Sequence, residues 1–183
     1  MKNWQDDKRW SDRFIPEIKS ILGLYLIGEP PLEEDAEHNT DLMVLKMDAV
    51  RIACRIRKHS YLANYGDEFT IRTYRPSGQK TELAKIIEGW GNYMFYGFSD
   101  IDQNCLSKWC LLDLNVFRLW LMRYMALNRG KLPSKEQNNV DNSSRFMAFQ
   151  ISNAPDEIVV AESSVLMKKI ANERTQKMQW EGK

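Results

Sequence analysis

The stretch "TDLMVLKMDAVRIACRIRK", residues 40–58, decides the expected fold. It begins with an acid, Asp41, continues through an apolar run, breaks at "KMDA", and ends in a run where apolar and polar residues alternate. Short extended runs joined by a short link are typical of β-hairpins. We therefore predict that residues 40–46 and 51–58 are antiparallel neighbours in a sheet.

The second run has a clean period of two. Successive side chains of a strand point to opposite faces, so Ile52, Cys54 and Ile56 share one face, whereas Arg55 and Arg57 share the other. We expect this run to be a central strand. Helices normally cover such a strand, so two arginines on one of its faces require a cleft that exposes them to solvent.

The rest of the chain alternates between helical and extended patterns. A mixed central sheet flanked by helices follows, which is an α/β or, more narrowly, α+β class of fold. The expected elements are a helix over 12–27, strands over 68–75 and 92–98, a helix over 80–90, a strand followed by a helix over 108–125, an edge strand over 145–151 and a helix starting near 163.

Length and composition fit one globular domain. The chain has 183 residues, of which 43% are hydrophobic and 28% charged. We expect a core over about 12–125 and a C-terminal loop and helix extension over about 126–183. No apolar run is long enough to span a bilayer, and no secretory signal is visible at the N-terminus. Three cysteines without CxxC spacing predict reduced thiols and a cytoplasmic protein.

Charge is unevenly distributed although the net charge is only +1. Residues 29–41 contain six acids and no Lys or Arg, whereas residues 51–85 contain eight basic and three acidic residues, a local net charge of +5. An acidic loop beside a basic sheet is suited to holding a metal ion against a polyanion. Charges that simply face solvent are the ordinary alternative.

The order of elements and the hairpin resemble the PD-(D/E)XK nuclease superfamily, the fold of many restriction endonucleases and Holliday-junction resolvases. The resemblance covers residues 12–98 and implies an αβββαβ core. In it Asp41 takes the place of the first metal-binding acid, and Glu17 that of the helical glutamate. Arg55 and Arg57 stand where the family has its second acid and its lysine.

This departure changes the chemistry that the resemblance implies. Phosphodiester hydrolysis in such a site uses Mg²⁺ or Mn²⁺, which take carboxylate oxygens as ligands. An arginine neither ligates a metal nor acts as a base, although it binds phosphate well. A surviving nuclease therefore needs a relocated carboxylate, and Asp35 is the best candidate to share the metal with Asp41. Otherwise no cofactor is expected.

Further basic residues are candidates for contact with a nucleic-acid backbone. They are Lys58, Arg72, Arg75 and Lys80. A solvated turn around "PSGQ" is the alternative for Arg72, Arg75 and Lys80.

Three functional hypotheses remain from the sequence. The first is a DNA-binding or DNA-processing protein with a divergent metal-dependent nuclease site. The second is a catalytically inactive nuclease-like protein that still binds DNA. The third is a small accessory protein of a phage or mobile element that acts through a protein partner or as a homodimer. None of them involves a membrane.

Overall fold

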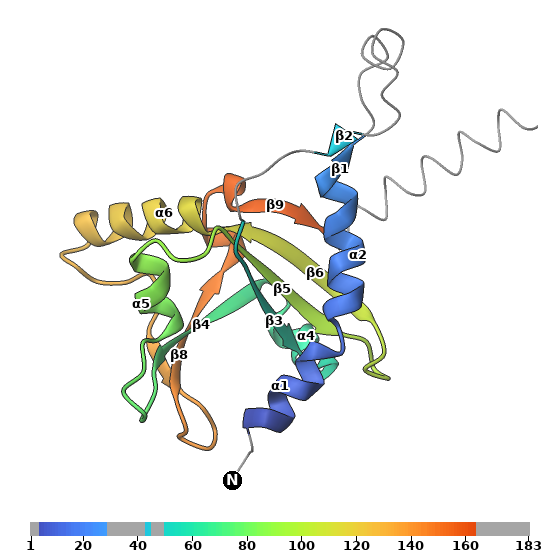
Figure 1. Cartoon of the computed structure of the whole chain (residues 1–183). Helices are drawn as coiled ribbons and strands as arrows, with labels where there is room; N and C mark the ends of the chain where they lie inside the picture. Colours follow the sequence, from blue (N-terminus) through green and yellow to red (C-terminus); the bar gives the residue numbers. More distant parts are fainter. Residues whose placement is uncertain (1–3, 29–42, 45–49, 164–183) are drawn as a thin grey trace, which may run out of the picture.

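The structure, a computed structural model, describes residues 4–28, 43, 44 and 50–163. It is an α+β fold in which two sheets are flanked by helices (Figure 1), so the expected class is confirmed. The helical elements are α1 (Trp4–Asp12), α2 (Ile15–Leu26), α4 (Leu62–Tyr65), α5 (Glu82–Ile87) and α6 (Leu114–Leu127), with single 3₁₀ turns at His59–Tyr61, Ile151–Asn153 and Asp156–Ile158.

A four-stranded sheet forms the centre of the molecule. Its order is β3 (Ile52–Arg57), β5 (Tyr93–Ser99), β6 (Leu106–Asp113) and β9 (Val159–Glu162). β3 runs parallel to β5, and the other pairs are antiparallel.

The predicted hairpin is wrong. Within the described residues, β2 (Met43–Val44) pairs with β1 (Ile27–Gly28), and β3 pairs with β5 instead. A parallel pair needs a long crossover, and here the chain from 58 to 92 supplies it with α4, a strand of the second sheet and α5. β3 is consequently an edge strand of its sheet as described, not the central strand that we expected.

A second, three-stranded sheet has the order β4 (Glu68–Tyr74), β8 (Arg145–Gln150) and β7 (Glu136–Asn138), all antiparallel. β8 lies in the middle, so the prediction of an edge strand over 145–151 is wrong. β8 and β9 both come from the predicted C-terminal extension, which therefore completes both sheets. The helix predicted to start near 163 lies outside the described residues.

Apolar side chains pack on both faces of the four-stranded sheet. On one face Phe95, Trp109 and Leu111 pack with Phe14, which directly precedes α2, and Ile18, in the first turn of α2. The opposite face joins the second sheet and α6 in a larger cluster. Its buried members include Phe69, Ile71, Met94, Tyr96, Leu112, Phe117 and Phe149.

The helix predicted over 12–27 is α2, and a helix that was not predicted, α1, precedes it, with a break at Arg13 and Phe14 between them. Phe14 is 1% exposed, so this break inserts a large apolar side chain into the core. α1 is thereby free to lie alongside β3 and α4 in the lower part of Figure 1.

Candidate functional site

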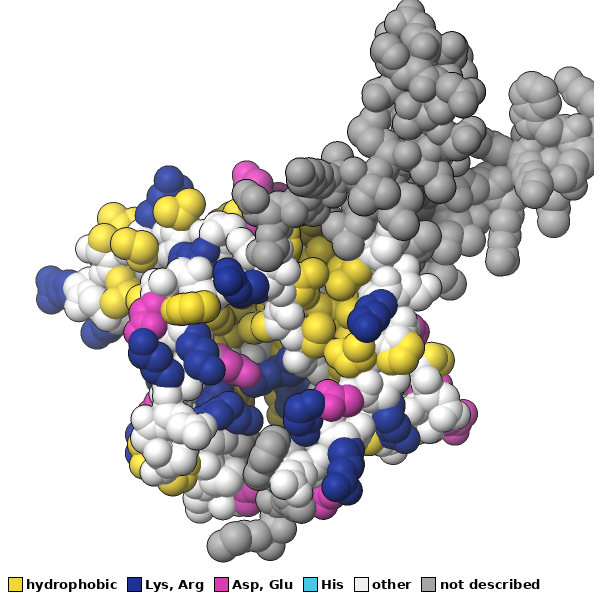
Figure 2. All heavy atoms as spheres, viewed as in Figure 1, with side chains coloured by type: hydrophobic (Ala, Val, Ile, Leu, Met, Phe, Trp, Pro, Cys, Tyr) yellow, Lys and Arg dark blue, Asp and Glu magenta, His cyan; other side chains and the backbone are white. Residues whose placement is uncertain are grey.

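A cleft opens between the two sheets, beside the edge strand β3. Its volume is about 620 Å³, and α1, β3, β4 and α5 contribute to its lining. Figure 2 shows Lys and Arg side chains gathered around a hollow on this face. The charged lining consists of six basic residues, Lys8, Arg55, Arg57, Lys58, Arg72 and Arg75, against two acidic residues, Asp7 and Glu82.

The alternation of β3 explains why two arginines face this cleft. Arg55 and Arg57 lie opposite Tyr96 and Phe98 of β5 in the register, so they point to the side of the sheet that faces β4. Ile56 is 8% exposed and packs into the cluster on the other face. The predicted division of faces is confirmed, and the edge position of β3 supplies the opening that the arginines need.

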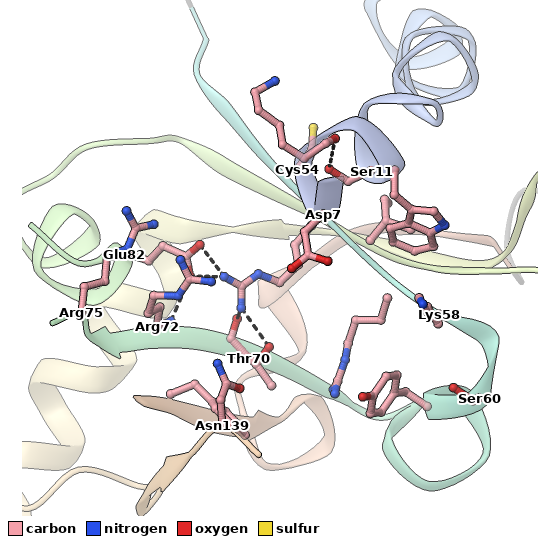
Figure 3. A pocket seen from close by; sticks show the side chains of 17 residues that line it. Asp7, Ser11, Cys54, Lys58, Ser60, Thr70, Arg72, Arg75, Glu82 and Asn139 are labelled. Atoms are coloured by element: carbon pink, nitrogen blue, oxygen red, sulfur yellow. Dashed lines mark hydrogen bonds and ion pairs between the residues drawn. The ribbon is translucent and has the colours of Figure 1, made fainter. Parts of the chain in front are cut away.

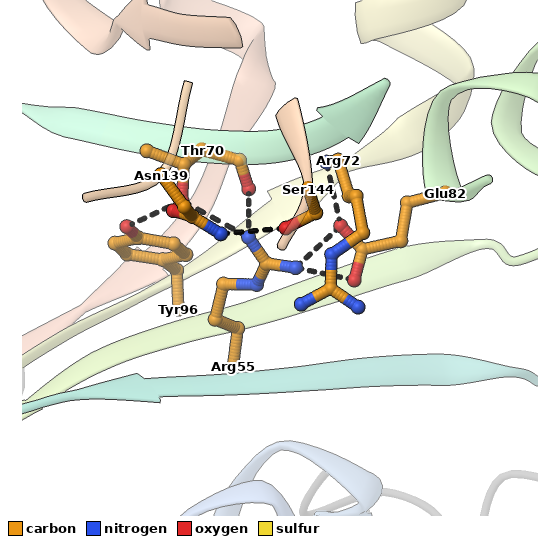
Figure 4. Close-up of polar contacts among 7 residues, drawn as sticks. All are labelled: Arg55, Thr70, Arg72, Glu82, Tyr96, Asn139 and Ser144. Atoms are coloured by element: carbon orange, nitrogen blue, oxygen red, sulfur yellow. Dashed lines mark hydrogen bonds and ion pairs between the residues drawn. The ribbon is translucent and has the colours of Figure 1, made fainter. Parts of the chain in front are cut away.

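Arg55 ties three elements together at the floor of the cleft (Figure 4). Its Nη1 donates to the carbonyl oxygen of Thr70 at 2.9 Å and to the Thr70 hydroxyl at 3.0 Å. Its Nη2 donates to both carboxylate oxygens of Glu82 on α5. Glu82 also accepts the backbone N–H of Arg72 at 2.9 Å. This carboxylate therefore joins β3, β4 and α5, and Arg55 is held in one place.

Arg72 and Arg75 lie at the same end of the cleft (Figure 3). Partial burial, together with the neighbouring charges of Arg55 and Arg75, lowers the pKa of Arg72 from its usual value, while Glu82 and Asp7 act in the opposite sense. In the described part of the chain, no group accepts a hydrogen bond from the Arg72 side chain. The Nε of Arg75 is buried and likewise has no partner there.

Aromatic rings accompany the basic residues at the other end of the cleft. The Arg57 guanidinium lies 4.2 Å from the ring centre of Tyr61 and 5.4 Å from that of Tyr65. The Lys58 ammonium lies 6.0 Å from the ring centre of Trp10 on α1. Cations stacked on aromatic faces stay charged and keep N–H donors available for a ligand.

The structure brings together only part of the predicted site. Arg55, Arg57, Lys58, Arg72 and Arg75 line one cleft. Asp35 and Asp41, the expected metal ligands, lie outside the described residues, and their role stays a prediction.

Glu17 and Lys80 do not line this cleft. Glu17 accepts the backbone N–H of Leu106 at 3.0 and 3.1 Å, and so caps the start of β6. Lys80 pairs with Glu88 at 2.6 Å on the surface. The expected convergence of Glu17 with Arg55 and Arg57 is therefore not what the structure has.

Sequence reasoning missed the partner of Arg55 and the contribution of α1. Glu82 is 27 positions from Arg55, and no local pattern links them. Asp7, Lys8 and Trp10 reach the cleft only because the chain turns before α2. The spacing of Tyr61 and Tyr65, four residues apart directly after Arg57 and Lys58, was the one available signal for the aromatic end.

Comparisons of the chain with protein-family models, curated proteins and solved structures gave no match. Among the residues that the structure describes, no cluster of three or more His, Cys, Asp or Glu side chains is placed to hold a metal ion. No helix in the same residues is long and apolar enough to cross a membrane. The cleft is therefore the feature of this chain that points to a function.

Proposed function

We propose that this chain is a DNA-binding protein that holds the backbone of a DNA strand in the cleft between β3 and β4. The observation that carries the proposal is the excess of basic side chains there, six against two acids, of which Arg72 and Arg75 have donors without protein acceptors in the described residues. Guanidinium groups match phosphate oxygens in geometry as well as charge. Phosphate contacts of this kind supply most of the affinity for DNA whatever its sequence.

The size of the cleft favours a single strand over a duplex. A volume of about 620 Å³ is that of a small-molecule site. The major groove alone of B-DNA is about 12 Å wide, so a whole duplex is much too large to enter. Aromatic rings beside basic groups, as at Tyr61 and Trp10, are the usual surroundings of a single strand.

The first prediction concerns salt. We expect a short single-stranded oligonucleotide to bind with an affinity that falls linearly with salt on logarithmic axes. Replacing Arg57 and Lys58 together by alanine should weaken binding at least about tenfold and reduce the slope by about 1.4, because each lost phosphate contact with a single strand removes about 0.7. Fluorescence anisotropy over a salt titration measures both quantities.

The matched control is Arg123→Ala. Arg123 is exposed on α6 and does not line the cleft, so its loss changes the net charge without touching the proposed contacts. Affinity and slope should stay near those of the unchanged protein. If the oligonucleotide does not bind at low salt, or if both variants lose affinity equally, the cleft is not a DNA site.

The second prediction concerns cleavage. We expect the purified protein to bind DNA without nicking plasmid in Mg²⁺ or Mn²⁺. The resemblance to PD-(D/E)XK nucleases requires a carboxylate where Arg55 stands, and Arg55 is engaged with Glu82 and Thr70. Metal-dependent nicking that disappears in both Asp35→Ala and Asp41→Ala would instead establish the catalytic form of the proposal, with the metal on relocated carboxylates.

A further inference from the structure

We propose that the Arg72 and Arg75 end of the cleft is a pocket for a phosphate monoester, the dianionic group at the end of a DNA strand. This inference rests on the proposed function and makes it more specific. Such a pocket would distinguish the end of a strand from the internal phosphodiesters, which any basic surface attracts.

The charge of the pocket matches a dianion. Three guanidinium groups, from Arg55, Arg72 and Arg75, line this end of the cleft together with one carboxylate, Glu82 (Figure 3), which leaves an excess charge of +2. Asp7, exposed on α1, also lines the cleft and offsets part of this excess. An internal phosphodiester carries a single negative charge, whereas a terminal phosphate carries between about −1.5 and −2 at pH 7.

The N–H donors that have no acceptor lie on Arg72 and Arg75. The Nη1 and Nη2 donors of Arg55 already form hydrogen bonds with Thr70 and Glu82. Arg55 therefore acts mainly as a fixed positive charge. The Arg72 guanidinium and the buried Arg75 Nε are left without acceptors in the part of the chain that the structure describes. A buried N–H without an acceptor is costly, so a site that carries one is completed by a ligand oxygen or by water.

The backbone that carries Arg72, and the side chain of Arg55, are held in place before a ligand arrives. Glu82 binds the backbone N–H of Arg72 as well as the Arg55 side chain, so it fixes the strand that carries Arg72. A site assembled in this way loses little freedom when it binds. Burial, and after it the charges of Arg55 and Arg75, lower the pKa of Arg72, and a phosphate dianion would offset the repulsion among these three arginines.

The test compares one single-stranded oligonucleotide in three forms, with a 5′-phosphate, with a 3′-phosphate and with hydroxyl groups at both ends. We expect the form whose end enters the pocket to bind at least about tenfold more tightly than the hydroxyl form, since charge-assisted guanidinium–phosphate bonds are strong and bidentate. Inorganic phosphate should remove this advantage by competition. A gain for either end supports the pocket and identifies the terminus that it accepts.

Arginine variants show where the gain arises. Arg72→Ala and Arg75→Ala should each bring the phosphorylated form close to the hydroxyl form, and Arg72→Lys should restore only part of the gain because an ammonium lacks the planar fork. Arg123→Ala should leave the ratio unchanged. Circular dichroism checks that each variant folds, and the comparison of oligonucleotides in the unchanged protein does not depend on any variant.

A pH titration provides a second readout. The second proton of a phosphate monoester binds with a pKa of about 6, so the ratio of the two affinities should fall as the pH drops below that value. The charged groups around this pocket are Arg55, Arg72, Arg75, Glu82 and Asp7. The hydroxyl-ended oligonucleotide, titrated in parallel, accounts for pH effects on binding outside the pocket. His59, the histidine within the described residues, does not line the cleft.

If the unchanged protein binds the three oligonucleotides equally well, the proposal of a pocket for a terminal phosphate is wrong. If that binding is still salt-dependent, the proposed DNA-binding function stands without it. If none of the three binds, the proposed function itself has failed, so the two outcomes are distinguishable.

Discussion

Replacing Phe117 with alanine is expected to lower the free energy of unfolding by about 3–5 kcal/mol, the usual cost of removing a fully buried phenylalanine. Phe117 is 0% exposed. Its ring centre lies 5.4 Å from that of Phe69 on β4 and 5.1 Å from that of Phe149 on β8, both in edge-to-face geometry. The ring therefore attaches α6 to the two main strands of the second sheet, and its removal leaves a cavity between them.

Urea denaturation followed by tryptophan fluorescence measures this loss. Leu119→Ala is the matched control, because Leu119 lies on the same helix but is 57% exposed, and its change should stay within about 0.5 kcal/mol. Phe117→Leu should be intermediate, since it retains most of the buried apolar volume. Similar losses at positions 117 and 119 would show that α6 does not pack on the second sheet as described.

Glu82→Gln is expected to cost about 2 kcal/mol of stability, within the range for hydrogen bonds to charged groups. The side chains of Arg55 and Glu82 are only 21% and 31% exposed, so water replaces little of what is lost. The variant removes the negative charge of Glu82 from the end of the cleft that Arg55, Arg72 and Arg75 line. Inorganic phosphate should recover part of this stability, because a ligand that binds only the folded state raises its stability.

The control for this variant is Glu88→Gln. Glu88 pairs with Lys80, but their side chains are 40% and 61% exposed, and exposed pairs contribute less than about 1 kcal/mol. We expect a much smaller loss there and no greater recovery by phosphate than in the unchanged protein. If Glu82→Gln and Glu88→Gln behave alike in urea with and without phosphate, Glu82 does not organise the arginines of the cleft.

The sequence by itself determined most of the extended segments and which residues of β3 share a face, although β7 and β9 were not predicted. The alternation in β3 correctly placed Arg55 and Arg57 together, opposite Ile56. The change from strand to helix within 108–125 was also predicted correctly. Asp113 ends β6 there and caps α6, accepting the backbone N–H groups of Asn115 at 2.6 Å and Val116 at 3.2 Å. These features depend on neighbours a few residues apart, which a local pattern records.

Strand partners were decided only by the tertiary structure. Local alternation is compatible with any neighbour, and the predicted hairpin was lost because β3 pairs with β5, whose residues 94–99 are all buried. That parallel pairing requires the whole segment 58–92 to cross over before β5 returns, and it puts β4 and α5 beside the arginine face of β3. A pattern that spans a few residues cannot report such a connection.

The candidate site was decided in the same way. The basic residues could be named from the sequence, since charge alone marks them. Their arrangement depends on Glu82, which reaches Arg55 across 27 positions, and on the turn that brings α1 to the cleft. The pairing of charges, and the N–H donors that remain without an acceptor, depend on which side chains meet in the folded structure. Only the folded chain therefore defines the pocket.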